Sequence, residues 1–279
     1  QRQMCIRDRS NTMNITIKSS RTVGGRIAAP PSKSMAHRAV LCAALAKGTS
    51  HLHHLAFSKD ISATLGAAGR LCARVTTGEN DAVVEGLGRF LPVDAPVDCC
   101  ESGSTLRFLL PLFMALGRTD AVFTGSDRLL SRPIPGDLGL RRTEQGLALT
   151  RPLTAGRWSL PGDETSQLIS GMLLALPLLP GDSDITVTGR AVSRPYVQMT
   201  LAVMARHGVT VEKITDGWHI PGGQFCRPAP LLDEPDWSAA AYWLVLRALL
   251  PRQRREALRI PLAPPPYLCL LYTSDAADD

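Results

Sequence analysis

The sequence predicts an α/β domain made of three repeated units, with helices inside and strands on the outside. Three segments open with Ser or Thr and continue as an apolar helix, over residues 32–48, 102–117 and 165–181. Each is followed by a strand-like stretch, a second helix, a glycine and two short strands, and the pattern recurs every ~60–70 residues. Three such βαβαββ-type units indicate one domain with approximate threefold organisation.

The second half of each unit follows the same pattern. A glycine is expected at the left-handed end of each second helix, because that conformation favours a residue without Cβ. These glycines are Gly69, Gly146 and Gly208. A strand, a polar turn and a second strand are predicted after each of them, over residues 73–88, 147–162 and 209–223.

The three units account for residues 24–230, which we predict to be an N-terminal substrate-binding domain. Residues 14–23 are expected to form a strand of a second domain, and residues 231–268 the start of that domain, which is incomplete. The terminal segments 1–13 and 269–279 carry no amphipathic period, and we interpret them as non-native tails.

The charge of the chain favours small anionic partners. The formal net charge is +6 and the pI is about 9.1. The arginines are scattered among apolar stretches, with no long basic run and no interleaved aromatics, so we expect phosphorylated metabolites and no nucleic acid. The longest apolar run, residues 168–180, is too short to span a bilayer, and no signal segment opens the chain. The expectation is a cytoplasmic enzyme with no membrane partner.

The three helix starts are the predicted functional feature. A helix N-terminus presents unpaired N–H groups and a positive dipole end, and Ser or Thr hydroxyls add further donors. Ser and Thr are also ordinary helix caps, so one such start would be weak evidence. Three starts in register, each with Lys, Arg or Gln close by, predict an anion-binding centre. Lys33 in a first turn opposes the dipole unless an anion lies there, and Arg38 can share a face with Ser34.

The motifs also resemble a known family. The segment APPSKSMAHRAVLCAALAKG resembles the N-terminal signature of EPSP synthases, whose core reads P-x-S-K-S-x-x-x-R. Four further motifs follow in the family's order: ESGSTLRFLLPL, TGSDRLLSRPIP, LPGDETSQLISGMLLALPLL and SRPYVQMTLAVMARHGV. Asp236-Trp237-Ser238-Ala239-Ala240 resembles the family's entry to its second domain, so the resemblance covers residues 13–246.

The resemblance implies an inside-out α/β barrel domain and a transferase of the shikimate pathway, which leads to chorismate and the aromatic amino acids. The enzyme would move the enolpyruvyl group of phosphoenolpyruvate to the 5-hydroxyl of shikimate 3-phosphate and release phosphate. Such anionic substrates suit guanidinium groups and helix termini, and no metal or cofactor is implied. We expect the intact enzyme to be a monomer.

Site residues also follow from the resemblance. The positions that contact shikimate 3-phosphate are Lys33, Ser34 and Arg38, the triplet Thr165, Ser166 and Gln167, and Ser193. Lys33 would also reach phosphoenolpyruvate. Gly103 matches a glycine on which phosphoenolpyruvate packs, and Arg128 an arginine that pairs with it. Further candidates beside these positions are Arg107, Arg194 and Tyr196.

The chain departs from the family pattern in several places. Cys100 stands where glycine is usual, and Glu101 where many members have Asn. The resemblance fades after Leu246, and a second set of three units is missing, so we expect a chain truncated at its C-terminus and inactive alone. The resemblance places the principal acid–base residues in that missing domain, and the catalytic residues are left unassigned here.

Other interpretations stay open. The related UDP-N-acetylglucosamine enolpyruvyl transferase shares the fold but typically carries S-K-N where this chain has Ser32-Lys33-Ser34. A chain that only binds shikimate 3-phosphate is a third. The cluster His51, His53 and His54 has no matching Cys, Asp or Glu spacing, so solvated histidines are expected rather than a metal site.

Overall fold

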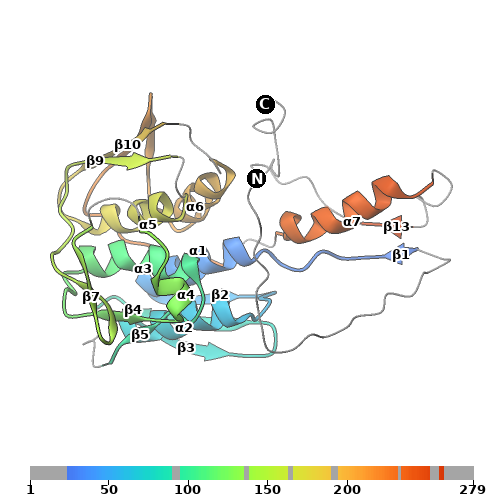
Figure 1. Ribbon diagram of the computed structural model, residues 1–279, viewed down its shortest axis with the longest axis horizontal. Coiled ribbons are helices and arrows are strands. Elements are labelled where there is room, and N and C mark those ends of the chain that lie inside the picture. Colours follow the sequence, from blue (N-terminus) through green and yellow to red (C-terminus); the bar gives the residue numbers. More distant parts are fainter. Residues whose placement is uncertain are drawn as a thin grey trace.

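The structure is a computed structural model that describes residues 24–89, 95–134, 138–162, 166–189, 194–231, 234–251 and 258–260. Most of these residues form three α/β units, and the remainder form a helix and two short strands (Figure 1). The prediction of helices inside and sheets outside is confirmed.

The first unit contains two long helices. α1 (Lys33–Leu45) begins after Ser32, whose hydroxyl accepts the Met35 N–H. α2 (Lys59–Leu71) begins after Ser58, which caps its first turn in the same way. The strands of this unit are β2 (Lys47–Leu52), β3 (Ala73–Thr77) and β4 (Ala82–Leu87).

The second and third units each contribute four strands. The second unit consists of β5 (Val97–Asp98), α3 (Gly103–Ala115), β6 (Val122–Thr124), α4 (Asp127–Leu130), β7 (Leu140–Thr143) and β8 (Gly146–Leu149). The third consists of β9 (Arg157–Pro161), α5 (Ser166–Ala175), the 3₁₀ turn η1 (Leu176–Leu178), β10 (Ser183–Thr188), α6 (Arg194–Arg206), β11 (Glu212–Ile214) and β12 (Gly217–Ile220).

The sheets share one topology, which confirms the repeat. Their strand orders are β5-β6-β8-β7 and β9-β10-β12-β11, with the first pair parallel and the other pairs antiparallel. The first unit has the order β2-β4-β3, which is the same arrangement without the leading strand among the described residues.

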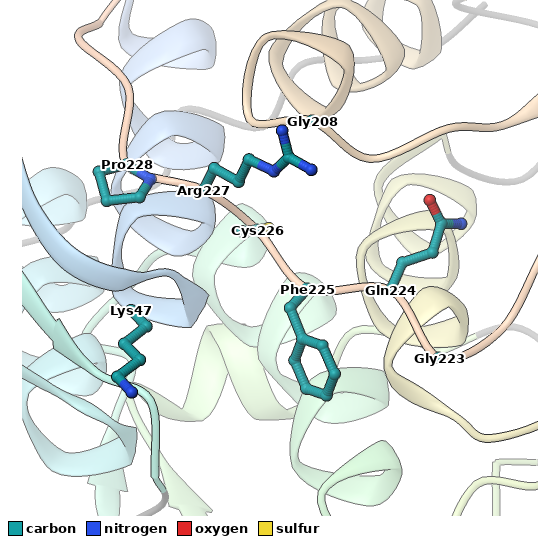
Figure 2. Close-up of a pocket in the computed structure, with 8 residues that line it drawn as sticks. All are labelled: Lys47, Gly208, Gly223, Gln224, Phe225, Cys226, Arg227 and Pro228. Carbon is teal, nitrogen blue, oxygen red and sulfur yellow. The ribbon is translucent and has the colours of Figure 1, made fainter.

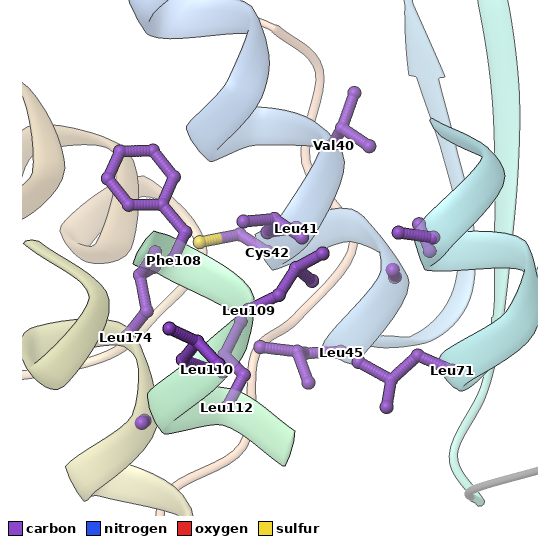
Figure 3. Packing of buried hydrophobic residues seen from close by; sticks show 14 of the residues in the cluster. Val40, Leu41, Cys42, Leu45, Leu71, Phe108, Leu109, Leu110, Leu112 and Leu174 are labelled. Carbon is purple, nitrogen blue, oxygen red and sulfur yellow. The ribbon is translucent and has the colours of Figure 1, made fainter. Parts of the chain in front are cut away.

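The helices form the core between these sheets. α3 packs against α5, and α1 packs against α2 and α6. Every residue of α1 from Met35 to Leu45 is buried, as expected for a helix surrounded by protein. Figure 3 shows Cys42 and Leu45 of α1, Leu71 of α2 and Leu109 of α3 meeting in this core.

Several predictions about the units were wrong in detail. The second helix of the middle unit is the single turn α4. Gly69 lies inside α2 rather than at its end, and Gly146 begins β8, where a Cβ would overlap the Phe123 carbonyl oxygen. Gly208 does follow α6 with φ +79°, as predicted. The hairpin of the middle unit is β7–β8, so it precedes the predicted range, and β9 belongs to the next sheet.

Two short strands and one helix from outside the three units lie apart from their sheets, on the right of Figure 1. β1 (Gly25–Arg26) pairs in parallel with β13 (Leu258–Arg259). α7 (Trp237–Leu249) begins after Asp236 and carries exposed apolar side chains, of which Tyr242 and Leu249 are the most open. The predicted tails and the strand over residues 14–23 lie outside the described residues. Within the described ranges, no helix has the length and apolar character needed to cross a bilayer.

Candidate functional site

Lys33, in the first turn of α1, forms an ion pair with Asp60 of α2. Its Nζ lies 2.8 Å from Asp60 Oδ2, and both side chains are partly exposed. Such a pair contributes at most about 1 kcal/mol of stability. The Asp60 carboxylate nevertheless offsets the unfavourable position of a cation in a first helical turn. The ammonium group has two further N–H donors for an anion.

Arg38 is buried among α1, α5 and α6, and protein acceptors surround it. Its Nε donates to Thr200 Oγ1 (2.7 Å), Nη1 to the Ser34 carbonyl (2.6 Å), and Nη2 to the Tyr196 carbonyl (2.8 Å) and Ser170 Oγ (3.3 Å). The guanidinium also lies 5.0 Å from the centre of the Phe108 ring. Burial lowers the pKa of Arg38 to about 10, which leaves it charged at neutral pH.

Polar groups from three segments meet at Gly103, the first residue of α3. Arg107 Nη1 lies 3.3 Å from Gln167 Oε1 and 3.5 Å from the Gly103 carbonyl oxygen, and its Nη2 donates to the Pro133 carbonyl at 3.1 Å. Gln167 Nε2 donates to Ser104 Oγ at 3.0 Å, which joins the starts of α3 and α5. A Cβ on Gly103 would lie 2.8 Å from Arg107 Nη1 and 3.5 Å from Arg132 Nη1.

The electrostatics of this cluster favour an anion. Burial lowers the pKa of Arg107, and the neighbouring charge of Arg132 lowers it further. Arg107 Nε is buried and has no hydrogen-bond partner among the residues that the structure describes. Two neighbouring guanidinium groups, a spare donor and a helix N-terminus are together suited to a phosphate or carboxylate.

Arg132 is a candidate that the sequence analysis missed. It follows α4 and approaches Gly103, and the predicted Arg128 lies within α4; both arginines are exposed. Both arginines occur in the segment TGSDRLLSRPIP, four residues apart. The signal that could have found Arg132 is Pro133 after it, because an Arg-Pro step ends the helical turn and leaves the arginine on a loop.

The remaining predicted residues are distributed between α1, α5 and α6. Ser34 is half-buried in the first turn of α1, and Ser166 is buried at the start of α5. Arg194 and Tyr196 are exposed in the first turn of α6. Thr165 and Ser193 lie outside the described residues.

Cys100, where the family pattern has glycine, lies in the turn before α3. It has φ +52°, in the left-handed region that favours glycine. Its backbone N–H donates to Asp98 Oδ1 at 2.7 Å. Burial and the neighbouring Asp98 raise the pKa of its thiol, so it remains protonated at neutral pH.

A separate hollow lies near the opposite ends of the helices (Figure 2). It is lined by Lys47, just after α1, by Gly208, just after α6, and by residues 223–228. A 13-residue helix is about 20 Å long, so this hollow is far from the helix starts. Helix C-termini carry the negative dipole end, which makes this hollow a poor anion site.

The histidines predicted to be solvated are near a shallow pocket. His51 and His53 stack with their ring centroids 6.2 Å apart, and His53 and His54 line the pocket together with Glu79 and Asp81. Within the described ranges, no group of three or more His, Cys, Asp or Glu side chains is arranged to hold a metal ion.

Comparison with solved structures identifies proteins that have a similar fold. Two structures of EPSP synthase from Acinetobacter baumannii superpose with TM-scores of 0.65 and 0.67, at 20% and 21% sequence identity. They cover 80% and 81% of this chain, and 52% and 54% of the solved chains. The predicted fold class of the enolpyruvyl transferase barrel is thereby confirmed.

Sequence comparison gives the family. Residues 17–254 match the family EPSP synthase (3-phosphoshikimate 1-carboxyvinyltransferase). The 3-phosphoshikimate 1-carboxyvinyltransferase of Clostridium kluyveri is 36% identical over 236 residues, covering 81% of this chain and 55% of the relative. That of Methanocorpusculum labreanum is 37% identical over 245 residues, covering 84% and 58%. The chain thus spans little more than half the length of these relatives, and it belongs to the EPSP synthase family.

Proposed function

We propose that this chain supplies one half of the site at which an enolpyruvyl group passes from phosphoenolpyruvate to the 5-hydroxyl of shikimate 3-phosphate. The observation that carries the proposal is the cluster at the start of α3, where Arg107, Arg132 and Gln167 surround Gly103. Membership of the family supports the substrate class. The complete reaction needs acid–base groups that we assign to a second domain, so the chain alone is proposed to bind without turnover.

Phosphoenolpyruvate is assigned to the start of α3. The bare backbone at Gly103 allows close approach, and Arg107 and Arg132 neutralise the phosphate or the carboxylate. Lys33, held by Asp60, is proposed to contact both substrates. No metal is needed in this assignment, because the guanidinium groups supply the positive charge.

Shikimate 3-phosphate is assigned to the neighbouring starts of α1, α5 and α6. The proposed ligands are Ser34, Thr165, Ser166, Gln167 and Ser193, with Arg194 and Tyr196 at the rim. Arg38 is proposed to hold the helix starts together, because protein groups accept hydrogen bonds from all three of its nitrogens. The second N–H of its Nη1 is proposed to contact the ligand. The exposed Arg128 of α4 is proposed to pair with phosphoenolpyruvate, as the resemblance implies.

The localisation, oligomeric state and domain division of the protein are proposed on the same basis. A biosynthetic transferase of small phosphorylated metabolites is assigned to the cytoplasm, as a monomer that binds no nucleic acid. The sequence predicts the N-terminal domain over about residues 24–230, and we now propose that it begins after β1, because β1 at residues 25–26 pairs with β13 outside the three units. β1, β13 and α7 are proposed to belong to the second domain, and the exposed apolar side chains of α7 support this division.

Titration calorimetry with two matched variants tests the proposal. Shikimate 3-phosphate is titrated into the chain with and without phosphoenolpyruvate, and UDP-N-acetylglucosamine serves as the competing ligand. Arg132→Ala is expected to weaken phosphoenolpyruvate binding at least tenfold, about 1.4 kcal/mol. Arg141→Ala, an exposed arginine of β7, is the control and should change affinity less than twofold. Equal losses in both variants, or binding of the UDP-sugar alone, would overturn the proposal.

A further inference from the structure

A buried chain of side-chain hydrogen bonds links α1, α2 and α3. His37 Nδ1 lies 2.7 Å from Thr64 Oγ1, which lies 2.7 Å from Thr105 Oγ1. The Thr105 hydroxyl reaches Ser102 Oγ at 2.6 Å. All four side chains are at least 98% buried, so water does not compete for these hydrogen bonds.

The chain ends on the cap of α3. Ser102 Oγ accepts the Thr105 backbone N–H at 3.2 Å, which fixes the turn that contains Gly103 and Ser104. The hydroxyls of Thr64 and Thr105 also lie 3.2 and 3.4 Å from the Asp60 carbonyl oxygen. Asp60 in turn holds Lys33. The network therefore contacts the first turn of α3, to which phosphoenolpyruvate is assigned, and also Asp60, which holds Lys33.

His37 has the properties of an anchor for this network. Burial, and then the charge of neighbouring Arg38, lower the pKa of His37 to about 3, so the imidazole is neutral and carries one donor and one acceptor. Its Nε2 has no partner among the described residues, so the Nδ1–Thr64 bond is the polar contact that it makes there. The ring packs edge-on against Phe108, with the centroids 6.4 Å apart, which fixes its orientation.

We infer that His37 is a positioning residue for the anion site at the start of α3, acting through Thr64 and Thr105 on the Ser102 cap. The inference rests on the proposed function for the identity of the anion, but the positioning itself is a property of the unliganded chain. Without the Nδ1 contact, the Thr64 hydroxyl loses one partner and holds the Thr105 hydroxyl less firmly. The first turn of α3 then opens more often.

Amide hydrogen exchange at Thr105 tests the positioning directly. In His37→Phe, which fills the space but removes the nitrogen, this amide is expected to exchange about fivefold faster than in wild type. His37→Asn places a polar atom near the Nδ1 position and should restore most of the protection. Thr64→Val removes the hydroxyl that joins His37 to Thr105 and keeps a side chain of similar shape. It replaces His37→Phe in this test if that variant does not fold.

His207 provides the matched control. It is also 1% exposed, its Nδ1 lies 2.8 Å from the Arg227 carbonyl oxygen, and its Nε2 likewise has no partner among the described residues. It directly follows α6 and precedes Gly208, which lines the hollow of Figure 2. His207→Phe should therefore lower stability and leave Thr105 exchange unchanged. If both phenylalanine variants speed Thr105 equally, or neither does, the inference is wrong.

Inorganic phosphate, followed by the NMR shifts of the Gly103 and Ser104 amides, gives the second readout. We expect His37→Phe to weaken phosphate binding about fivefold and His37→Asn less than twofold. Phosphate binding that is equally tight in wild type and His37→Phe would overturn the inference. If phosphate leaves these shifts unmoved in wild type while Thr105 exchange responds to His37→Phe, the proposed function fails and the positioning role stands.

Discussion

Replacing Cys100 by glycine is expected to stabilise the protein. Cys100 has φ +52°, and the left-handed conformation costs a residue with a Cβ about 1–2 kcal/mol. Glycine removes this cost. Its greater conformational freedom in the unfolded chain, however, lowers the stability by about 0.5–1 kcal/mol. The thiol contributes little, because Sγ lies 3.7 Å from Asp98 Oδ2, and the turn is held by the backbone N–H. The net gain should be about 0.5–1 kcal/mol in the free energy of unfolding.

Urea unfolding, supported by the thermal midpoint, measures this gain. For a domain of this size each kcal/mol moves the midpoint by about 2–4 °C. The matched control is Cys100→Ala, which removes the thiol but keeps both the Cβ and the strained backbone, and it should give no gain. A Cys100→Gly protein that is no more stable than Cys100→Ala would show that the left-handed turn costs nothing, which would refute the reasoning.

Two further predictions concern the buried ionisable groups. Arg38→Leu should lower the free energy of unfolding by about 3 kcal/mol, because it leaves the buried Thr200 hydroxyl and two carbonyl oxygens without their donor; a loss below about 1 kcal/mol in urea unfolding would contradict this. Acid should also destabilise the fold through His37, whose folded pKa of about 3 lies below its ordinary 6.5. The unfolded chain then binds the extra proton, so this stability is full above pH ~6.5 and is lost as the pH falls toward 3, at up to about 1.4 kcal/mol per pH unit. His37→Phe should reduce the dependence of the unfolding free energy on pH, as measured by urea unfolding between pH 3 and 6.5. An unchanged dependence would show that other groups cause it.

The helix starts were predictable because their signals are local. Ser32 and Ser102 each cap a helix through a hydroxyl that reaches the backbone three residues on, so the sequence is enough to place them. Helix ends were harder to place. α2 continues past Gly69 because its inner face is buried against α1, and that packing overrides the glycine's preference. The second helix of the middle unit shrinks to α4, and Pro133 close after it accounts for this, because the residue before a proline disfavours the helical conformation.

The site was predictable as a set of residue types but less well as a geometry. Motif matching found the segment that contains two arginines, but only the fold shows that Arg132 approaches Gly103. The buried chain through His37 and Thr64 has no sequence signature, because it joins residues from different helices. Whether an arginine is free for a ligand depends on such contacts between elements, which spacing along the chain does not report.

Arg38 and Arg107 illustrate this dependence. Arg38 is the sixth residue after the cap Ser32 and Arg107 the fifth after the cap Ser102, and each turns its Nη1 back to the carbonyl oxygen four residues earlier, Ser34 for one and Gly103 for the other. Their surroundings differ. Arg38 meets α5 and α6, and hydrogen bonds to protein groups engage all three of its nitrogens. Arg107 donates from Nη1 and Nη2 to Gln167 Oε1 and the Pro133 carbonyl oxygen, but it lies near the charge of Arg132, and its Nε has no partner among the described residues. Because a buried donor without a partner is unfavourable, an anion that reached Arg107 Nε would remove a cost that Arg38 Nε does not incur, and this difference supports the proposal that Arg107 binds an anion.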